Sequence, residues 1–398
     1  MSGYTDYLAD ALTDITPEEE NYREKLMELV RHFRSFGDSL TEFVSERGYT
    51  GAPEDTAAKV AFIRGRFESA GMEPPRFLPD WFTGGKEMNR ETAFSFCFAF
   101  GLNLAETNDF FRRVCLRRGF DCHSHRELVY YYCIQNGLPR SAAEEILSQI
   151  PAIPSGGVLP GSDVLYTESI LTALGGISTA EDLRKFILEN RQQFAYNNAT
   201  ATKYIRGLWQ SIGGSEGIAA RERARWEEFF GNPEESGKSA GVYSDWDVYL
   251  QILVADRELT DRLSGDRTLK PILRNNALLH RAAGDSFPDR EGINKLMNGR
   301  HVSNETVRKT LILLAFYRFW AERALSRPDG EYMYCAVGED GERAVYEINN
   351  FLVTAGYPEL YSGNPYDWIF LWSCQDAEPL GMFRLFMGEL LAEKSECD

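Results

Sequence analysis

The chain has 398 residues, of which 43% are hydrophobic and 26% charged, so it is globular and long enough for two or three domains. Its formal net charge of −17 excludes a protein that coats nucleic acid without regard to sequence, because phosphate repels a uniformly acidic surface. No stretch approaches the roughly 18 consecutive apolar residues of a membrane span, and residues 1–20 lack a basic region followed by an apolar one. We therefore expect a soluble, cytoplasmic protein.

Short helices separated by short breaks are predicted from the start of the chain. After an acidic tail at residues 1–19, apolar residues recur at three- and four-residue spacing in 20–36, 38–47 and 54–70. Glycines and prolines end each of these stretches. The pattern is typical of an all-α protein, and we expect its first helical unit to extend to residue 150.

Aromatic residues mark the next stretch, residues 77–102. Trp81 and Phe82 precede a glycine pair, and Asn89 then begins a predicted helix. We expect the two aromatic rings to be exposed, where they suit a protein partner better than the edges of bases.

Two pairs of arginines follow, spaced about one helical turn apart, so two of them are expected to share a helix face. They are Arg112 and Arg113, then Arg117 and Arg118. This cluster could bind phosphate or an acidic protein. A solvated stripe offset by neighbouring acids explains it equally well.

The densest group of side chains able to bind metal is Cys115, Cys122, His123, His125 and Cys133. A zinc site would need four of them to converge, but the spacing lacks a Cys-x-x-Cys pair. Apolar core positions explain the cysteines better, and a helix start explains the histidines. We expect reduced thiols in all seven cysteines, no bound metal and no cofactor.

A helical connector is expected at residues 151–240, with turn-forming residues at 151–161 and 231–241. The second of these is the best domain boundary by composition. Residues 241–398 are then expected to form a second helical unit, with a helix at 246–262.

The stretch at 287–316 carries the most information. Ile293 and Leu296 predict a short helix over 290–298, which Asn298 and Gly299 end because that pair readily adopts the left-handed conformation. Ser303 is predicted to cap a second helix. Residues 294–325 hold six basic and two acidic side chains, which makes a positive window in an acidic chain.

The order Ile-x-x-Leu-x-Asn-Gly-Arg-x-x-Ser-x-Glu-Thr-x-x-Lys in this stretch resembles the third and fourth helices of the XRE family of lambda-repressor-like DNA-binding domains. The resemblance implies that the helix at 289–297 enters the major groove. The DNA contacts that it implies are Arg290, Asn294, Lys295, Arg300 and Lys309.

The same order of turn, capped helix and following helices occurs twice, at 77–150 and at 287–391, which suggests an internal repeat. The first copy departs further from the DNA-binding pattern. We expect it to act as a protein-interaction surface formed by Trp81, Phe82, Arg112, Arg113 and Arg117.

The sequence favours a non-enzymatic regulator, because the five histidines are scattered and no phosphate loop or nucleophile elbow occurs. The expected partners are DNA or a protein, including a second copy of the chain, and not a membrane. The alternative is an adaptor or sensor, encoded by a mobile element or defence locus, that has lost DNA binding. The net charge and the acids Asp289 and Glu291 favour that alternative.

Overall fold

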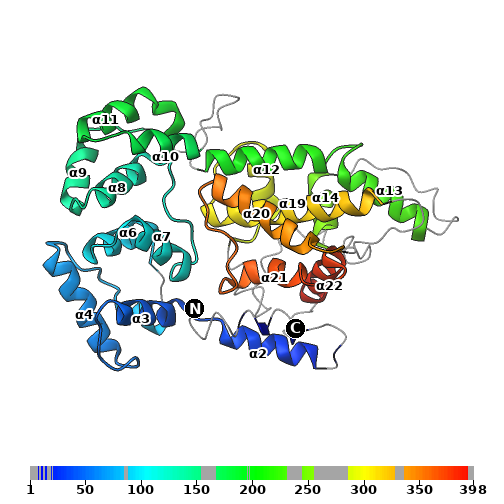
Figure 1. Ribbon diagram of the computed structural model, residues 1–398, viewed down its shortest axis with the longest axis horizontal. Helices are drawn as coiled ribbons and strands as arrows, with labels where there is room; N and C mark the ends of the chain where they lie inside the picture. Colours follow the sequence, from blue (N-terminus) through cyan, green and yellow to red (C-terminus); the bar gives the residue numbers. More distant parts are fainter. Residues whose placement is uncertain are drawn as a thin grey trace. The chain divides into compact units, whose positions relative to one another are not determined.

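A computed structural model of the chain describes residues 8, 10, 11, 14, 15, 19, 21–84, 88–153, 167–194, 196, 198–230, 244–254, 286–327 and 336–392. Every regular element in these ranges is a helix, so the chain is all-α, as its sequence predicted (Figure 1). None of the helices described is both long and apolar enough to cross a lipid bilayer. The loop expected at 231–241 and most of the loop expected at 151–161 lie outside the described residues.

The chain forms two compact units. Unit 1 comprises Met1–His32, Ala201–Val353 and Glu359–Asp398, and unit 2 comprises Phe33–Thr200 and Thr354–Pro358. These boundaries differ from the expected ones, since the described helices between 167 and 230 are divided between the two units. The helices of that region are divided between the units because some of them pack on α19 and others on the core of unit 2.

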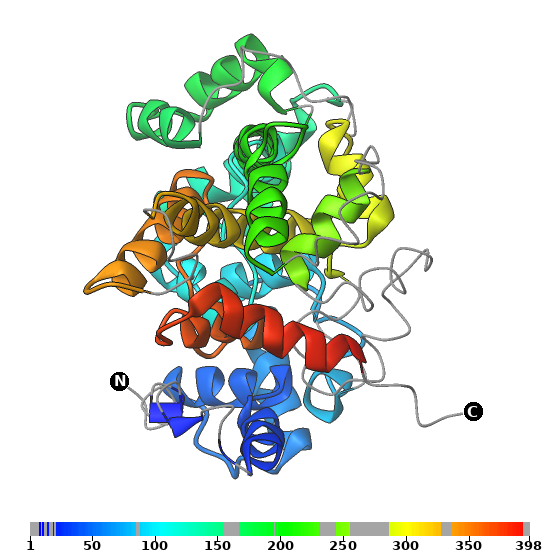
Figure 2. The ribbon, with the colours of Figure 1, turned by 90° about the vertical axis from the view of Figure 1, so that its right-hand side faces the viewer.

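Unit 2 is built around one core of buried side chains that extends from Leu40 to Phe194. Its helices are α3 (Phe36–Glu46), α4 (Thr56–Ser69), α5 (Asp80–Thr83), α6 (Arg90–Ala99), α7 (Leu104–Arg113), α8 (His125–Gln135), α9 (Arg140–Ser148), α10 (Thr167–Gly175), α11 (Ala180–Glu189) and the 3-10 helix η1 (Arg191–Phe194). Within this unit, α6 and α7 lie between α3 and α4 on one side and α8 to α11 on the other (Figures 1 and 2). Stacked and edge-to-face phenylalanines from α3, α6 and α7 fill the middle of the core.

Unit 1 is organised around the long helix α19, which is apolar on almost every side. Its helices are α2 (Tyr22–His32), α12 (Ala199–Ile212), α13 (Ile218–Phe230), α14 (Asp245–Leu253), α18 (Arg290–Met297), α19 (Asn304–Leu325), α20 (Asp340–Thr354), α21 (Pro365–Ser373) and α22 (Pro379–Ala392). In both ribbon views α19 lies between α12 and α22 (Figures 1 and 2). Such an all-round apolar helix is stable in water only when neighbouring helices cover it.

Local sequence signals set several helix ends as predicted. The hydroxyl of Ser303 accepts from the backbone N–H of Thr306 at 3.1 Å and starts α19, and Asn89 caps α6 in the same way. Gly299 adopts a φ of 66°, so the turn between α18 and α19 uses the left-handed conformation that glycine favours. The expected helix at 246–262 begins at Asp245 and continues to Leu253; residues 255–285 are not described.

The described residues of the acidic N-terminal segment do not form a free tail. Leu8, Ala11 and Ile15 are buried, and the Ile15 carbonyl accepts a hydrogen bond from the indole N–H of Trp372 at 2.8 Å. The acidic tail expected at 1–19 is therefore packed at these positions, where its apolar side chains are buried.

Unit 2 contains an ion pair between Arg90 of α6 and Glu127 of α8. The guanidinium and the carboxylate are 2.5 Å apart at Nε and Oε1. The guanidinium also donates to the Gly119 carbonyl, and Glu127 accepts from the backbone N–H of Asp121, which lies six residues earlier, at 2.6 Å. One carboxylate thereby fixes both a helix and the loop before it.

Unit 1 contains an ion pair of the same design between Arg308 of α19 and Asp367 of α21. The guanidinium donates to both carboxylate oxygens, at 2.5 and 2.8 Å, and also to the Glu359 carbonyl at 3.5 Å. Asp367 accepts from the backbone N–H of Tyr361, again six residues earlier, at 3.0 Å. The two units therefore hold their core helix and a later helix together through matching contacts.

Candidate nucleic-acid interface

Helix α18 is short and amphipathic, and its apolar side is anchored in unit 1. Ile293 and Leu296 are buried, and α14 packs against the helix. The carboxylate of Asp289 caps it by accepting from the backbone N–H of Gly292 at 2.7 Å. A Cβ at Gly292 would lie 3.2 Å from that carboxylate, so glycine leaves the cap room to close.

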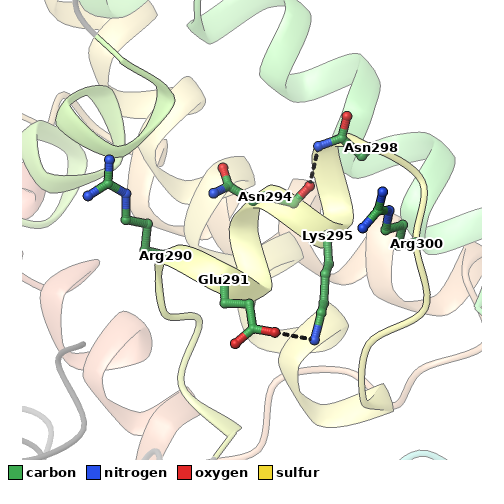
Figure 3. Close-up of a pocket in the computed structure, with 6 residues that line it drawn as sticks. All are labelled: Arg290, Glu291, Asn294, Lys295, Asn298 and Arg300. Carbon is green, nitrogen blue, oxygen red and sulfur yellow. Dashed lines mark hydrogen bonds and ion pairs between the residues drawn. The ribbon is translucent and has the colours of Figure 1, made fainter. Parts of the chain in front are cut away.

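Polar side chains cover the opposite side of α18 and the loop after it. They line a hollow of about 490 Å³ formed by Arg290, Glu291, Asn294, Lys295, Asn298 and Arg300, which we call the α18 surface. Figure 3 shows these side chains on one side of the helix, with Arg290 at its N-terminal end and Arg300 beyond its C-terminal end. The structure thus brings together four of the five side chains expected to contact DNA.

The α18 surface carries three cationic side chains and one anionic one. Lys295 and Glu291 form an ion pair of 2.7 Å across one helical turn, and their side chains are 42% and 74% exposed (Figure 3). An ion pair this exposed contributes little to stability, so water or a ligand can replace it. Asn298 donates to the Asn294 backbone carbonyl at 2.8 Å, and Asn294 itself is exposed.

Sequence reasoning placed neither Glu291 nor Asn298 among the contacting residues. The spacing of Glu291 and Lys295 is the usual spacing of a helical ion pair, and it could have identified Glu291 as the partner of that lysine. Asn298 was recognised only as a helix terminator, although its side chain also reaches the same surface.

Lys309, the fifth expected DNA contact, does not belong to the α18 surface. The residue is half-buried, and its ammonium donates to the hydroxyl of Ser286 at 2.8 Å, beside the ring of Tyr366. Burial lowers the pKa of the Lys309 ammonium to about 8. The side chain therefore points toward Ser286 and Tyr366 rather than lining the α18 surface.

Most of the remaining cations in the positive window at 294–325 are paired within unit 1. Arg308 pairs with Asp367, Arg318 with Glu347 and Arg323 with Asp340. Carboxylates therefore neutralise part of the excess positive charge of the window. Of the cations in the window, Lys295 and Arg300 lie on the α18 surface.

The expected aromatic interaction surface in unit 2 is not exposed. Trp81 is 3% exposed and belongs to the core. Phe82 packs against that core, and the ammonium of Lys59 lies 4.4 Å from its ring centroid. The expectation of exposed rings is wrong because α5 is a single turn whose aromatic residues fold inward.

The end of α7 separates Arg112 and Arg113 from Arg117 and Arg118. Helix α7 ends at Arg113, and Leu116 adopts a positive φ of 50°, so Arg117 and Arg118 do not continue its face. Arg113 pairs with Asp109 at 3.2 Å, and Arg117 donates to the Met88 carbonyl at 2.8 Å.

Of these arginines, Arg118 is buried and Arg112 is half-buried. Arg118 lies 3.5 Å from Asp121 and donates to the Ala355 carbonyl at 3.2 Å. The expected shared helix face is therefore wrong, because the chain turns at Leu116. Arg117 and Arg118 instead hold loops in place.

The three cysteines of the cysteine and histidine cluster belong to the core of unit 2, His123 is buried and His125 is half-buried. Cys115, Cys122 and Cys133 are buried, and burial raises the pKa of the Cys122 thiol to about 12. The ring of His123 contacts the Gln193 carbonyl at 3.0 Å and the Thr200 hydroxyl at 3.1 Å. Within the described residues no three histidine, cysteine or acidic side chains are grouped as metal ligands.

Comparison of the chain with protein-family models, with curated proteins and with solved structures gave no match. The case for a function therefore depends on the chemistry of the α18 surface.

Proposed function

We propose that the chain is a DNA-binding regulator whose α18 enters the major groove through the α18 surface. The observation that carries this proposal is the convergence of Arg290, Lys295 and Arg300 on one exposed surface of a chain with a net charge of −17. Where most of the surface is acidic, a local group of cations directs a polyanion to one place.

The dimensions of the helix suit this role. An α-helix with its side chains is about 10–12 Å across, and the major groove of B-DNA is about 12 Å wide. Asn294 lies in the middle of the exposed side, where its amide can pair with the N6 and N7 atoms of adenine. Arg290 and Arg300 lie at the two ends, where phosphates flank the groove (Figure 3).

The negative charge of the rest of the chain favours sequence-specific binding over non-specific binding to any duplex. A uniformly basic protein binds any duplex, whereas repulsion by the rest of this surface weakens every complex that lacks base contacts. The proposal is therefore a cytoplasmic regulator that recognises a limited set of sites and needs no cofactor for binding.

The test is binding of the purified chain to fragments of its own genomic DNA, at low and at near-physiological salt. We expect a few fragments to be retained at the higher salt and the double variant Arg290→Ala/Lys295→Ala to lose them. The charge-matched control is Arg64→Ala/Lys185→Ala, which removes two exposed cations from unit 2 and should retain the same fragments.

Loss of all binding by the wild-type chain as salt rises, or equal binding by the Arg290→Ala/Lys295→Ala variant, would contradict the proposal. Either result would direct attention to the alternative, an adaptor whose partner is a protein.

A further inference from the structure

One feature of the α18 surface opposes a purely electrostatic role. Of the described residues that line it, only Glu291 is acidic, and its side chain is 74% exposed. A carboxylate close to phosphates raises the free energy of every complex in which it faces the backbone. Glu291 therefore disfavours any docking register that does not give its carboxylate a hydrogen-bond donor.

The major groove offers such a donor next to an acceptor. In a C·G pair the N4 amino group of cytosine and the O6 atom of guanine are hydrogen-bonded to each other, so they lie about 2.9 Å apart. The Glu291 oxygen and the Lys295 nitrogen lie 2.7 Å apart. The ion pair thus has the spacing and the charge pattern to lie across the edge of one base pair.

We infer that Glu291 and Lys295 together read a C·G base pair, with Glu291 accepting from cytosine N4 and Lys295 donating to guanine O6 and N7. This inference rests on the proposed DNA binding and assigns its specificity. The pair lies between Arg290 and Arg300 on the α18 surface (Figure 3), so phosphate contacts by those arginines would place it over bases rather than over the backbone.

An A·T pair fits the same ion pair less well. Its N6 donor lies between two acceptors, N7 of adenine and O4 of thymine, and both repel a carboxylate. Guanine instead offers O6 and N7 side by side to the ammonium, and its partner cytosine offers a donor to the carboxylate. The ion pair therefore discriminates against A·T, by about tenfold.

The experiment selects binding sites from duplexes of random sequence with the wild-type chain and with Glu291→Gln and Lys295→Gln. The wild type should enrich C·G at one fixed position about tenfold over A·T. Glu291→Gln should shift the preference at that position towards A·T, because a glutamine amide pairs with N6 and N7 of adenine. Lys295→Gln should weaken the C·G preference at the same position.

Glu342→Gln is the matched control, since it makes the same change at an exposed residue of α20 and should leave every preference unchanged. If the wild type selects a site but neither variant alters any base preference, the inference is wrong and DNA binding stands. If the two variants alter the base preference at different positions, Glu291 and Lys295 do not recognise the same base pair and the inference is wrong. If the wild type enriches no sequence, both the inference and the proposed function fail.

Discussion

The guanidinium of Arg308 donates two hydrogen bonds to the carboxylate of Asp367, fifty-nine residues further along the chain. The two side chains are 7% and 1% exposed, so both charges are removed from water. Each charge is tolerable only because the other is present and because backbone groups complete the hydrogen bonding of the carboxylate. This pair joins α19 to α21, and α19 directly follows the helix proposed to bind DNA.

Replacing Arg308 with methionine should leave a buried carboxylate without its counter-charge. We expect the free energy of unfolding to fall by about 3–5 kcal/mol, measured by urea denaturation. The matched variant is Arg90→Met in unit 2, whose pair with Glu127 is more exposed, and we expect a smaller loss of about 1–2 kcal/mol. Equal losses in the two variants would contradict the role assigned to burial.

The sequence predicted those parts of the fold that depend on neighbouring residues. Ser303, Asn89 and Gly299 act within one turn of their own position, so their effects could be read from the local order of residues. The apolar periodicity also located the helices expected at 38–47, 54–70 and 290–298 to within two residues of their ends. The division into units was not predictable in this way, because it depends on long-range packing. Helix α13 packs on α19, whereas α11 packs on the core of unit 2.

The candidate site was predicted in part for the same reason. Arg290, Asn294 and Lys295 belong to one helix face, so their spacing alone places them together. The place of Lys309 could not be predicted, because its inward direction depends on Ser286 and Tyr366, which contact it only in the folded unit. Single-sequence periodicity cannot distinguish such a cation from an exposed one.

The half-buried Lys309 should make stability depend on pH in the alkaline range. Its pKa is lowered from 10.5 to about 8 in the folded chain, so between these values the unfolded state binds more protons and the free energy of unfolding rises with pH. Below about pH 8 both states are protonated and the full penalty is present. Lys309→Met should therefore be more stable than wild type by about 1–3 kcal/mol at pH 7.

That advantage should shrink between pH 8 and pH 10.5, as urea denaturation at both ends of the range would measure. Lys185→Met, at an exposed position of α11, provides the control and should show no such change. An advantage that is constant across this range would mean that the Lys309 ammonium is well solvated.

Arg300 and Asn294 should differ in how they affect DNA binding. Arg300→Ala is expected to weaken binding to all duplexes by a similar factor and to reduce the slope of log affinity against log salt by about 1, because one phosphate contact is lost. Asn294→Ala should keep the slope and change the preference at one base pair. Fluorescence anisotropy on selected and scrambled duplexes between 50 and 200 mM salt, roughly the range over which such slopes are resolved, distinguishes the two effects.

Asp289 has two opposing effects on the α18 surface, and two substitutions separate them. Its carboxylate caps α18, yet its charge repels phosphate. Asp289→Asn keeps a capping oxygen and removes the charge, so we expect about two- to fivefold tighter DNA binding at low salt with little change in stability. Asp289→Ala removes both, which should lower the free energy of unfolding by about 1 kcal/mol and fray the first turn of α18.

Fraying should offset the gain from the lost charge, so the alanine variant is expected to bind DNA no more tightly than wild type. Circular dichroism and DNA titration of both variants measure the two effects separately. Equal affinities for Asp289→Asn and Asp289→Ala would show that the order of the first turn of α18 has no part in binding. That result would place the DNA contacts on Lys295 and Arg300 rather than on Arg290, because Arg290 is the first residue of that turn.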